Sequence, residues 1–371
     1  MFIVLGCAFF LQAQQISFQL SKQPKPGEKI FLAGNINGWN PAAENYQFDA
    51  DGRLQVKAKP GDRIAYKCTL GSWEKVEVSA NGNGIANREL EVHGDTTIII
   101  SIGSWSHLFP QKAKQHTASK QVVVFDSAFQ FPSLGYSKSI RVYLPPDYHQ
   151  SNKKYAVLYM HDGQNIFDDY TSGYGEWHVD EAMDSLYKAT GKSFIVVGMD
   201  HGNAKRINEY NPYDSTQYGQ GVGELYLKDL VQKLKPAIDK AYRTETSAKY
   251  TWIAGSSMGG LISTYGVLLY PKTFGGAGIF SPAYWINTSI KKNAKAFKNP
   301  AKNQIEFFFY CGGKEGERMV PDMHEIAGIL CTASKMNCSI TVDVSAGHNE
   351  TAWTQHFHTF LAFMQNAGAF N

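Results

Sequence analysis

The sequence predicts an α/β domain, with a mostly parallel sheet flanked by helices, that is preceded by a small all-β sandwich. Residues from about 15 to 103 form short alternating runs separated by turn signals, which is typical of an antiparallel sandwich. From residue 120 to 371, strand-like runs that are almost continuously apolar alternate with helical segments. A sheet covered by helices on both faces requires such apolar strands. A chain of 371 residues is long enough for both domains.

The overall composition is that of an ordinary globular protein. Hydrophobic residues make up 43% of the chain and charged residues 19%, and the formal net charge is +3. A net charge this small does not favour a nucleic acid or an anionic membrane surface as a partner. None of the cysteines has the spacing of a zinc site, and we expect neither a metal nor a cofactor.

The N-terminus, residues 1–14, is predicted to be a signal peptide. About eleven mostly apolar residues precede a polar stretch, and we expect cleavage after Ala13. This run is too short to span a bilayer, and no other run is long enough. We therefore expect a periplasmic or secreted protein with no integral membrane span. In an oxidising compartment Cys331 and Cys338 could form a disulfide, and buried free thiols are the equal alternative.

The first domain, residues 15–103, contains several short runs with strand character. Every second residue of the run 64–70 is apolar or a cysteine, so Cys68 is expected in the core. The stretch from Ile102 to Lys120 carries Gly, Ser, Pro, Gln and Lys with little periodicity, which indicates a linker over residues 104–119. The predicted strands are 29–33, 54–58, 64–70 and 96–101.

The second domain, residues 120–371, alternates predicted strands with helices. The helix predicted over 224–242 has apolar residues at helical spacing, and Pro236 should kink or split it. The first strands are expected to be antiparallel at one edge of the sheet. The other predicted helices are 261–269, 322–334 and 351–366. The predicted strands are 121–125, 139–144, 155–160, 193–198, 250–254, 276–280, 305–311 and 339–344.

A Gly-x-Ser-x-Gly turn joins the strand predicted at 250–254 to the helix that follows it. Gly255 and Gly259 flank Ser257, and these small residues let the backbone turn sharply enough to lift the serine above the sheet. The N-terminus of the next helix would favour a developing oxyanion beside the hydroxyl. Ser257 is therefore the candidate nucleophile, and an ordinary glycine-rich loop is the alternative.

A serine nucleophile needs a base and a carboxylate, and after this kind of turn the acid precedes the base in the chain. His348 lies just after the last predicted strand and just before the last helix, which makes it the candidate base. A histidine that only caps the helix is the alternative. Glu315 is the first choice for the acid, because the two glycines before it permit a tight turn after the strand 305–311. Glu317 and Asp322 are the other choices.

Two backbone N–H groups are expected to stabilise the oxyanion. One belongs to Met258, directly after the nucleophile, and we assign the other to Gln164, in the loop after the third strand. His161 and Asp162 in the same loop have the chemistry of an acid–base pair, but their position at a strand end favours a structural role. Further residues could either line a substrate pocket or order nearby loops: Arg206, Glu209, Tyr210 and Trp285.

Three segments of the first domain, 31–40 (FLAGNINGWN), 66–77 (YKCTLGSWEKVE) and 86–88 (ANR), resemble parts of the starch- and glycogen-binding immunoglobulin-like modules. The resemblance implies an immunoglobulin-like sandwich that binds polysaccharide. A flat indole can cover the apolar face of a sugar, although the same tryptophans could instead pack the module against its neighbour. Four residues fall where such modules place side chains that stack on sugars or bind their hydroxyls: Trp39, Lys67, Trp73 and Asn87.

The second domain carries motifs at six places: VYLPPDY (142–148), YAVLYMHDGQN (155–165), GEWHVD (175–180), GSSMGG (255–260), SPAYW (281–285) and GH (347–348). Together they resemble the putative esterase family of α/β-hydrolases, which is similar to esterase D, the family 1 carbohydrate esterases and the siderophore trilactone esterases. The resemblance covers residues 120–370 and implies acyl transfer to Ser257 and release of the acid by water that His348 activates. Many members of the family have Asp where this chain has Glu315, which is one methylene longer, so the loop geometry must compensate.

These features predict a serine carboxylic ester hydrolase that removes acetyl or feruloyl groups from carbohydrates through an acyl-enzyme. A siderophore trilactone esterase and an acyltransferase of related fold are alternatives. A glycan-binding protein with an inactive hydrolase domain is a third, and the presence of nucleophile, acid and base in the required order argues against it.

Overall fold

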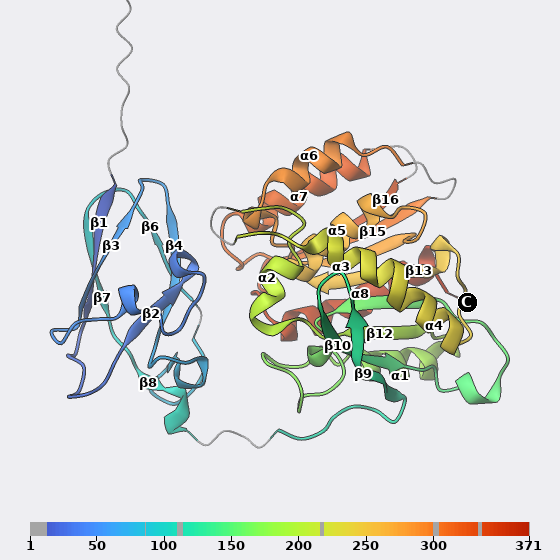
Figure 1. Cartoon of the computed structure of the whole chain (residues 1–371), viewed down its shortest axis with the longest axis horizontal. Helices are drawn as coiled ribbons and strands as arrows, with labels where there is room; N and C mark the ends of the chain where they lie inside the picture. Colours follow the sequence, from blue (N-terminus) through green and yellow to red (C-terminus); the bar gives the residue numbers. More distant parts are fainter. Residues whose placement is uncertain are drawn as a thin grey trace, which may run out of the picture. The chain divides into compact units, whose positions relative to one another are not determined.

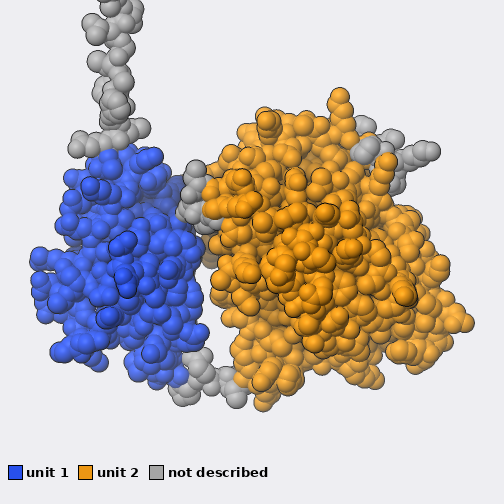
Figure 2. All heavy atoms as spheres, in the orientation of Figure 1, with its two compact units in different colours: residues 1–113 blue, residues 114–371 orange. Residues whose placement is uncertain are grey.

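The computed structural model describes most of the chain as two compact units. Figure 2 shows them in different colours, residues 1–113 and residues 114–371. The predicted signal peptide lies outside the described residues except at Ala13 and Gln14. The described residues are 13–85, 87–109, 114–215, 219–299, 304–332 and 336–370.

The first unit consists of short strands around one apolar core. One sheet has the order β3-β1-β7, another the order β2-β4-β6, and β5 pairs with β8. Alternate residues of these strands face the core, and Cys68 is buried among them as predicted. The strands are β1 (Gln14–Leu20), β2 (Phe31–Gly34), β3 (Arg53–Ala58), β4 (Arg63–Thr69), β5 (Glu77–Val78), β6 (Arg88–Glu91), β7 (Thr96–Ile100) and β8 (Ser104–Trp105).

The prediction of a purely antiparallel sandwich is wrong at one position, because β1 and β7 pair in parallel. These strands stand at the two ends of the unit in the sequence. Turn signals indicate which strands form hairpins with their immediate neighbours, but they carry no information on a pairing between distant strands.

The second unit is built on an eight-stranded sheet with the order β16-β15-β14-β13-β11-β12-β10-β9 (Figure 1). All eight predicted strands are present. The six strands from β11 to β16 are parallel, and β10 is antiparallel to both β9 and β12, which confirms the antiparallel edge. The strands are β9 (Val122–Phe131), β10 (Tyr136–Tyr143), β11 (Val157–His161), β12 (Ile195–Met199), β13 (Thr251–Ser256), β14 (Gly276–Phe280), β15 (Ile305–Gly312) and β16 (Met336–Asp343).

Helices cover both faces of this sheet, as the apolar strands require (Figure 1). Two of them, α1 (Val179–Thr190) and α8 (Glu350–Asn366), share one core with one face of the sheet. The other face packs against α3 (Gly223–Asp229), α4 (Lys235–Ala241), α5 (Met258–Leu269), α6 (Ser289–Ala296) and α7 (Met319–Cys331). None of the described helices combines the length and apolarity that a membrane span needs.

The helix predicted over 224–242 is split at the expected place. A π-helical turn, Leu230–Leu234, separates α3 from α4, and Pro236 lies in the first turn of α4. Because proline has no N–H to donate to the preceding turn, the regular hydrogen-bond pattern cannot continue through this point. The prediction that Pro236 kinks or splits the helix is confirmed.

A disulfide joins Cys331, at the end of α7, to Cys338 in β16. From the sequence, a disulfide and two free thiols were equally compatible with these closely spaced cysteines. The structure contains the disulfide. Its Cα atoms are 5.7 Å apart, within the usual range for this bond. The disulfide therefore connects the edge strand of the sheet to the helix that precedes it.

Reduction of this disulfide should destabilise the protein. Closing a loop with a sequence separation of 7 residues contributes about 2 kcal/mol in the chain-entropy account. Dithiothreitol, or the double substitution Cys331→Ser/Cys338→Ser, should lower the free energy of unfolding in urea by that amount. The double variant is the control, because a reductant should no longer change its stability. Two thiols that react at these positions in the native, unreduced chain would contradict the prediction.

Candidate active site

Ser257 occupies a strained turn between β13 and α5. Its backbone angles are φ 57° and ψ −118°, a region that non-glycine residues rarely adopt and that costs roughly 1–3 kcal/mol. Two backbone hydrogen bonds hold the turn: the Ser257 N–H donates to the Phe280 carbonyl (2.9 Å), and the Ala283 N–H donates to the Ser257 carbonyl (3.0 Å). The serine predicted as nucleophile is thus fixed from the end of the neighbouring strand β14.

The glycines around Ser257 are required by close packing. A Cβ atom on Gly255 would lie 3.0 Å from the His161 ring and 3.1 Å from the backbone of Gly259. A Cβ on Gly260 would lie 3.0 Å from the Phe280 carbonyl oxygen. Small residues therefore let the end of β11 and the end of β14 approach the turn from its two sides.

The predicted base and acid lie side by side. His348 Nδ1 is 2.8 Å from Glu315 Oε2, and the Glu315 side chain is fully buried. The turn after β15 brings the carboxylate to this position, and the turn requires glycine. A Cβ on Gly312 would lie 2.5 Å from the Ala346 carbonyl oxygen, and a Cβ on Gly313 would lie 2.7 Å from Val344. The two glycines that favoured Glu315 in the sequence thus allow its loop to pack against the loop that carries His348.

A further serine, Ser281, orients Glu315. The Ser281 hydroxyl donates to Glu315 Oε1 (2.6 Å) and accepts from the indole N–H of Trp353 (2.9 Å). The Gly312 N–H donates to the same carboxylate oxygen (2.7 Å), and the Trp353 ring meets His348 edge to face. Sequence reasoning assigned no role to Ser281; its signal was the position directly after β14, at the edge where the other candidates lie.

The other candidate acids lie elsewhere. Asp322 is in the first turn of α7 and pairs with Arg318 (3.2 Å). Glu317 is exposed in the loop before that helix. The helix-capping alternative for His348 also fails, because Asn349 supplies the cap: its side chain accepts from the Ala352 N–H.

The three candidates share one edge of the sheet. Ser257, Glu315 and His348 follow β13, β15 and β16, which are parallel and therefore end at the same edge. No hydrogen bond joins Ser257 to His348 among the residues that the structure describes. Hydrogen bonds of this kind often tighten only when substrate is bound.

One candidate oxyanion donor begins the helix after the turn, and the other lies in the loop after β11. Met258 is the first residue of α5, so its N–H has no acceptor within the helix. Gln164 lies in a short 3-10 helix, Gly163–Asn165, directly after β11, and its side-chain oxygen accepts from the His201 N–H (3.2 Å). A Cβ atom on Gly255 would lie 3.0 Å and one on Gly259 3.3 Å from the His161 side chain, so the end of β11 lies close to the turn.

His161 and Asp162 have structural roles, as their position at a strand end indicated. Burial lowers the pKa of His161 to about 3, and Nδ1 of its neutral ring bonds to the Tyr226 hydroxyl (2.8 Å). Burial alone would raise the pKa of Asp162, but the charge and the two 2.7 Å hydrogen bonds of Arg206 hold it below its ordinary value. The Tyr210 hydroxyl accepts from the Asp162 N–H (3.2 Å).

The remaining residues suggested for a pocket mostly order this region. Glu209 is buried, where it accepts from Lys138, from the Tyr136 hydroxyl (2.9 Å) and from the Gly202 N–H (2.9 Å). Trp285 packs, partly buried, against the main core. The loop-ordering alternative therefore describes Glu209, as it describes Arg206 and Tyr210.

Glu350 lies close to the candidate base in the sequence, and sequence reasoning did not single it out. It is the first residue of α8, two positions after His348, and burial raises its pKa to about 7. The charges of His348, Asp162 and Arg206 all act on it. A carboxyl group that titrates near neutrality therefore lies within the electrostatic reach of the candidate base.

The four residues suggested for sugar binding lie in the first unit. The rings of Trp39 and Trp73 are neighbours, with centroids 6.2 Å apart, and Trp73 is 37% exposed. Lys67 is half-buried, and burial lowers its pKa. Asn87 is exposed. The structure thus brings the two indoles together at the surface.

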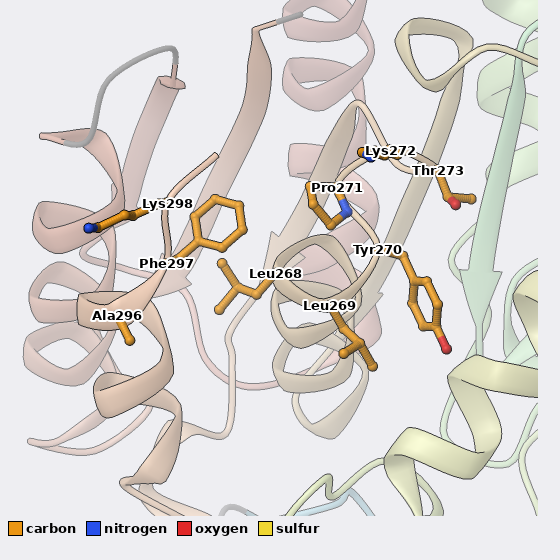
Figure 3. Close-up of a pocket in the computed structure, with 9 residues that line it drawn as sticks. All are labelled: Leu268, Leu269, Tyr270, Pro271, Lys272, Thr273, Ala296, Phe297 and Lys298. Carbon is orange, nitrogen blue, oxygen red and sulfur yellow. The ribbon is translucent and has the colours of Figure 1, made fainter. Parts of the chain in front are cut away.

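A surface pocket of about 440 Å³ lies away from these residues, between the end of α5 and the segment after α6 (Figure 3). It is lined by Leu268, Phe297 and their neighbours. Ser257 directly precedes the first residue of α5, whereas the pocket lies at the last residue of the same helix. The helix between them is about 18 Å long. The pocket is therefore separate from the candidate active site.

Comparison with known proteins places these residues in a family. The sequence model of the putative esterase family matches residues 132–364, well over half of the chain. Protein YbbA of Bacillus subtilis is 25% identical over 188 residues, 48% of this chain and 70% of that protein. An endo-1,4-beta-xylanase/feruloyl esterase of Xylanibacter ruminicola is 31% identical over 193 residues, 50% of this chain but only 24% of that protein. The enterobactin esterase FES of Shigella flexneri, solved with enterobactin, shares the fold with a TM-score of 0.56 and 13% identity, over 95% of this chain and 92% of that chain.

Removal of the Ser281 hydroxyl should impair turnover more than substrate binding. Ser281→Ala removes one of the hydrogen bonds to Glu315, and a hydrogen bond to a charged acceptor is worth about 1.5–3 kcal/mol. We expect kcat for p-nitrophenyl acetate to fall about tenfold or more, with KM little changed.

Ser263→Ala is the matched control, because Ser263 is equally buried in α5 and its hydroxyl has no hydrogen-bond partner among the described residues. Equal kinetic losses in the two variants would show that Ser281 does not position the acid.

Proposed function

Because the chain belongs to the putative esterase family, we propose that Ser257, His348 and Glu315 form the catalytic triad of a serine carboxylic ester hydrolase. The observation that carries this proposal is the 2.8 Å contact between His348 Nδ1 and the buried Glu315 carboxylate, at the sheet edge where the strained turn presents Ser257. A carboxylate at Nδ1 leaves Nε2 of the same ring to accept the serine proton.

In the proposed mechanism, the Ser257 hydroxyl attacks the ester carbonyl while His348 takes its proton. Glu315 holds the ring and stabilises the imidazolium. The N–H groups of Met258 and Gln164 donate to the oxyanion, and the N-terminal end of α5 favours the same negative charge. His348 then protonates the departing alcohol and activates the water that releases the acid.

The proposed substrates are carbohydrates that carry acetyl or feruloyl esters. The relative from Xylanibacter ruminicola, named as an endo-1,4-beta-xylanase/feruloyl esterase, supports this choice. The neighbouring indoles of Trp39 and Trp73 support a second role, binding of polysaccharide by the first unit. Such binding would keep the esterase near its substrate.

A siderophore trilactone is the second candidate substrate. One observation favours it: the enterobactin esterase shares the fold over 95% of this chain, so the likeness is not restricted to the hydrolase unit. The two candidates differ in the alcohol released, a sugar hydroxyl or a serine-type hydroxyl.

We also propose that the protein acts in the periplasm or outside the cell. The apolar residues at the start of the sequence support export. The disulfide between Cys331 and Cys338 supports an oxidising compartment, where such bonds persist.

Ser257→Ala should abolish ester hydrolysis. Loss of a serine nucleophile removes covalent catalysis, so kcat for p-nitrophenyl acetate should fall by at least about 10³-fold. Circular dichroism of the variant should match the wild type, since the substitution removes only an oxygen. Hydrolysis at the wild-type rate in a folded variant would refute the assignment of Ser257.

The wild type and the Ser257→Ala variant also distinguish the two candidate substrates, acylated carbohydrate and siderophore trilactone. Faster Ser257-dependent release of ferulate or acetate from xylan than hydrolysis of a trilactone would support the carbohydrate proposal. The reverse order would support the siderophore alternative.

The double substitution Trp39→Ala/Trp73→Ala tests the first unit separately. If the indoles stack on sugars, each lost aromatic contact should weaken binding, and retardation in a starch, glycogen or xylan gel should disappear. Turnover of p-nitrophenyl acetate, which needs no polysaccharide, should be unchanged. If the wild-type chain migrates freely in all three gels, the first unit does not bind these polysaccharides and its role is structural.

A further inference from the structure

Three side chains that can bind metals converge at the start of α1, outside the triad. Glu176 and His178 lie in the loop before this helix, and Glu181 is in its first turn. One possible ligand atom from each lies within 4.8 Å of the other two. The spacing of cysteines and histidines in the sequence gave no sign of this cluster, because two of its members are glutamates.

The two distances from His178, one of them a long hydrogen bond to Glu181, also fit ligands of a shared cation. His178 Nδ1 is 3.3 Å from Glu176 Oε2 and 3.4 Å from Glu181 Oε1. A single N–H cannot serve both carboxylates well, and charge-assisted hydrogen bonds are usually about 2.7–2.9 Å long. Ligands bound at about 2.0–2.2 Å to one tetrahedral zinc ion are about 3.3–3.5 Å from each other.

One oxygen of the buried Glu176 carboxyl group has no hydrogen-bond partner among the residues that the structure describes. The Glu176 side chain is only 1% exposed. Its Oε2 accepts from the Thr117 hydroxyl (2.6 Å), whereas its Oε1 has no hydrogen-bond partner in the described part of the chain. A buried carboxyl oxygen without a donor is a favourable contact for a bound cation.

We propose that Glu176, His178 and Glu181 bind a zinc ion. Two carboxylates and one imidazole are zinc ligands, and an imidazole disfavours calcium and magnesium, which prefer oxygen. The side chains of His178 and Glu181 are 49% and 42% exposed, so the ion can enter from solvent and complete its coordination with water.

The position of the site indicates a structural role. Thr117 and Ser119, in the segment that precedes the sheet, bond to Glu176 and Asp180. On the other side, the Thr354 hydroxyl donates to the Glu176 carbonyl (3.4 Å), and the ring of Trp177 contacts that of Trp353. A zinc ion here would fasten this segment and α1 close to α8, the helix that begins directly after His348.

Zinc binding can be measured on the full, untagged chain after treatment with EDTA. Titration with zinc chloride in a calorimeter, together with elemental analysis, should show one strongly bound zinc ion per chain. At a free concentration 100-fold above Kd, zinc should raise Tm by roughly 5–10 °C. His178→Ala and Glu181→Gln should each weaken binding by at least about 100-fold, because each removes a ligand.

His93→Ala is the matched control, since His93 is exposed beside a single carboxylate, Glu91, at 3.8 Å. This variant should bind zinc as the wild type does. Because His178 and Glu181 are partly exposed, their variants should fold, and circular dichroism checks this. Wild-type affinity in His178→Ala, loss of binding in His93→Ala, or binding of calcium but not zinc would each overturn the proposal. Zinc affinity is measured without ester hydrolysis, so this test can fail or succeed independently of the Ser257→Ala experiment.

Discussion

A buried carboxylate must be surrounded by hydrogen-bond donors, and the donors of Glu315 come from three different parts of the sheet edge. The Gly312 N–H belongs to the end of β15, the Ser281 hydroxyl follows β14, and His348 follows β16. Each donor is correctly placed only if its strand is in register with the next. The orientation of the candidate base therefore depends on the assembly of the whole carboxyl edge, rather than on any one loop.

The backbone carries this register beyond the ends of the strands. The N–H groups of Ser257, Ser281 and Gly313 donate to the carbonyls of Phe280, Tyr310 and Asp343, each in the next strand of the sheet. Both serines have positive φ, 57° and 44°, which unsupported backbone would not keep. The pairing of the sheet thus continues past its regular strands and stabilises the two unusual conformations that the site requires.

The features that could be predicted from the sequence are those set by local chemistry. Continuous apolar runs indicated the parallel strands, and the glycines around Ser257 and before Glu315 indicated tight turns, which the packing of Gly255 and Gly312 explains. Features that depend on partners distant in sequence could not be predicted. Ser281 acquires its role from Trp353, 72 residues away, and the parallel pairing of β1 with β7 has no local signal. Glu350 is unusual only because folding buries it beside other charges.

The place of the candidate acid and base in the sheet has a consequence for partial unfolding. Ser257 follows β13, which has neighbours on both sides, whereas His348 follows β16, the edge strand, which pairs only with β15. Edge elements with exposed side chains, such as Ile340 and Val344 here, open at lower free energy than the central strands. Detachment of β16 would carry His348 away from Glu315 while the rest of the sheet persisted. In the proposed mechanism, detachment of this one edge strand would be enough to stop hydrolysis, so a population that retains most of its secondary structure would already be inactive.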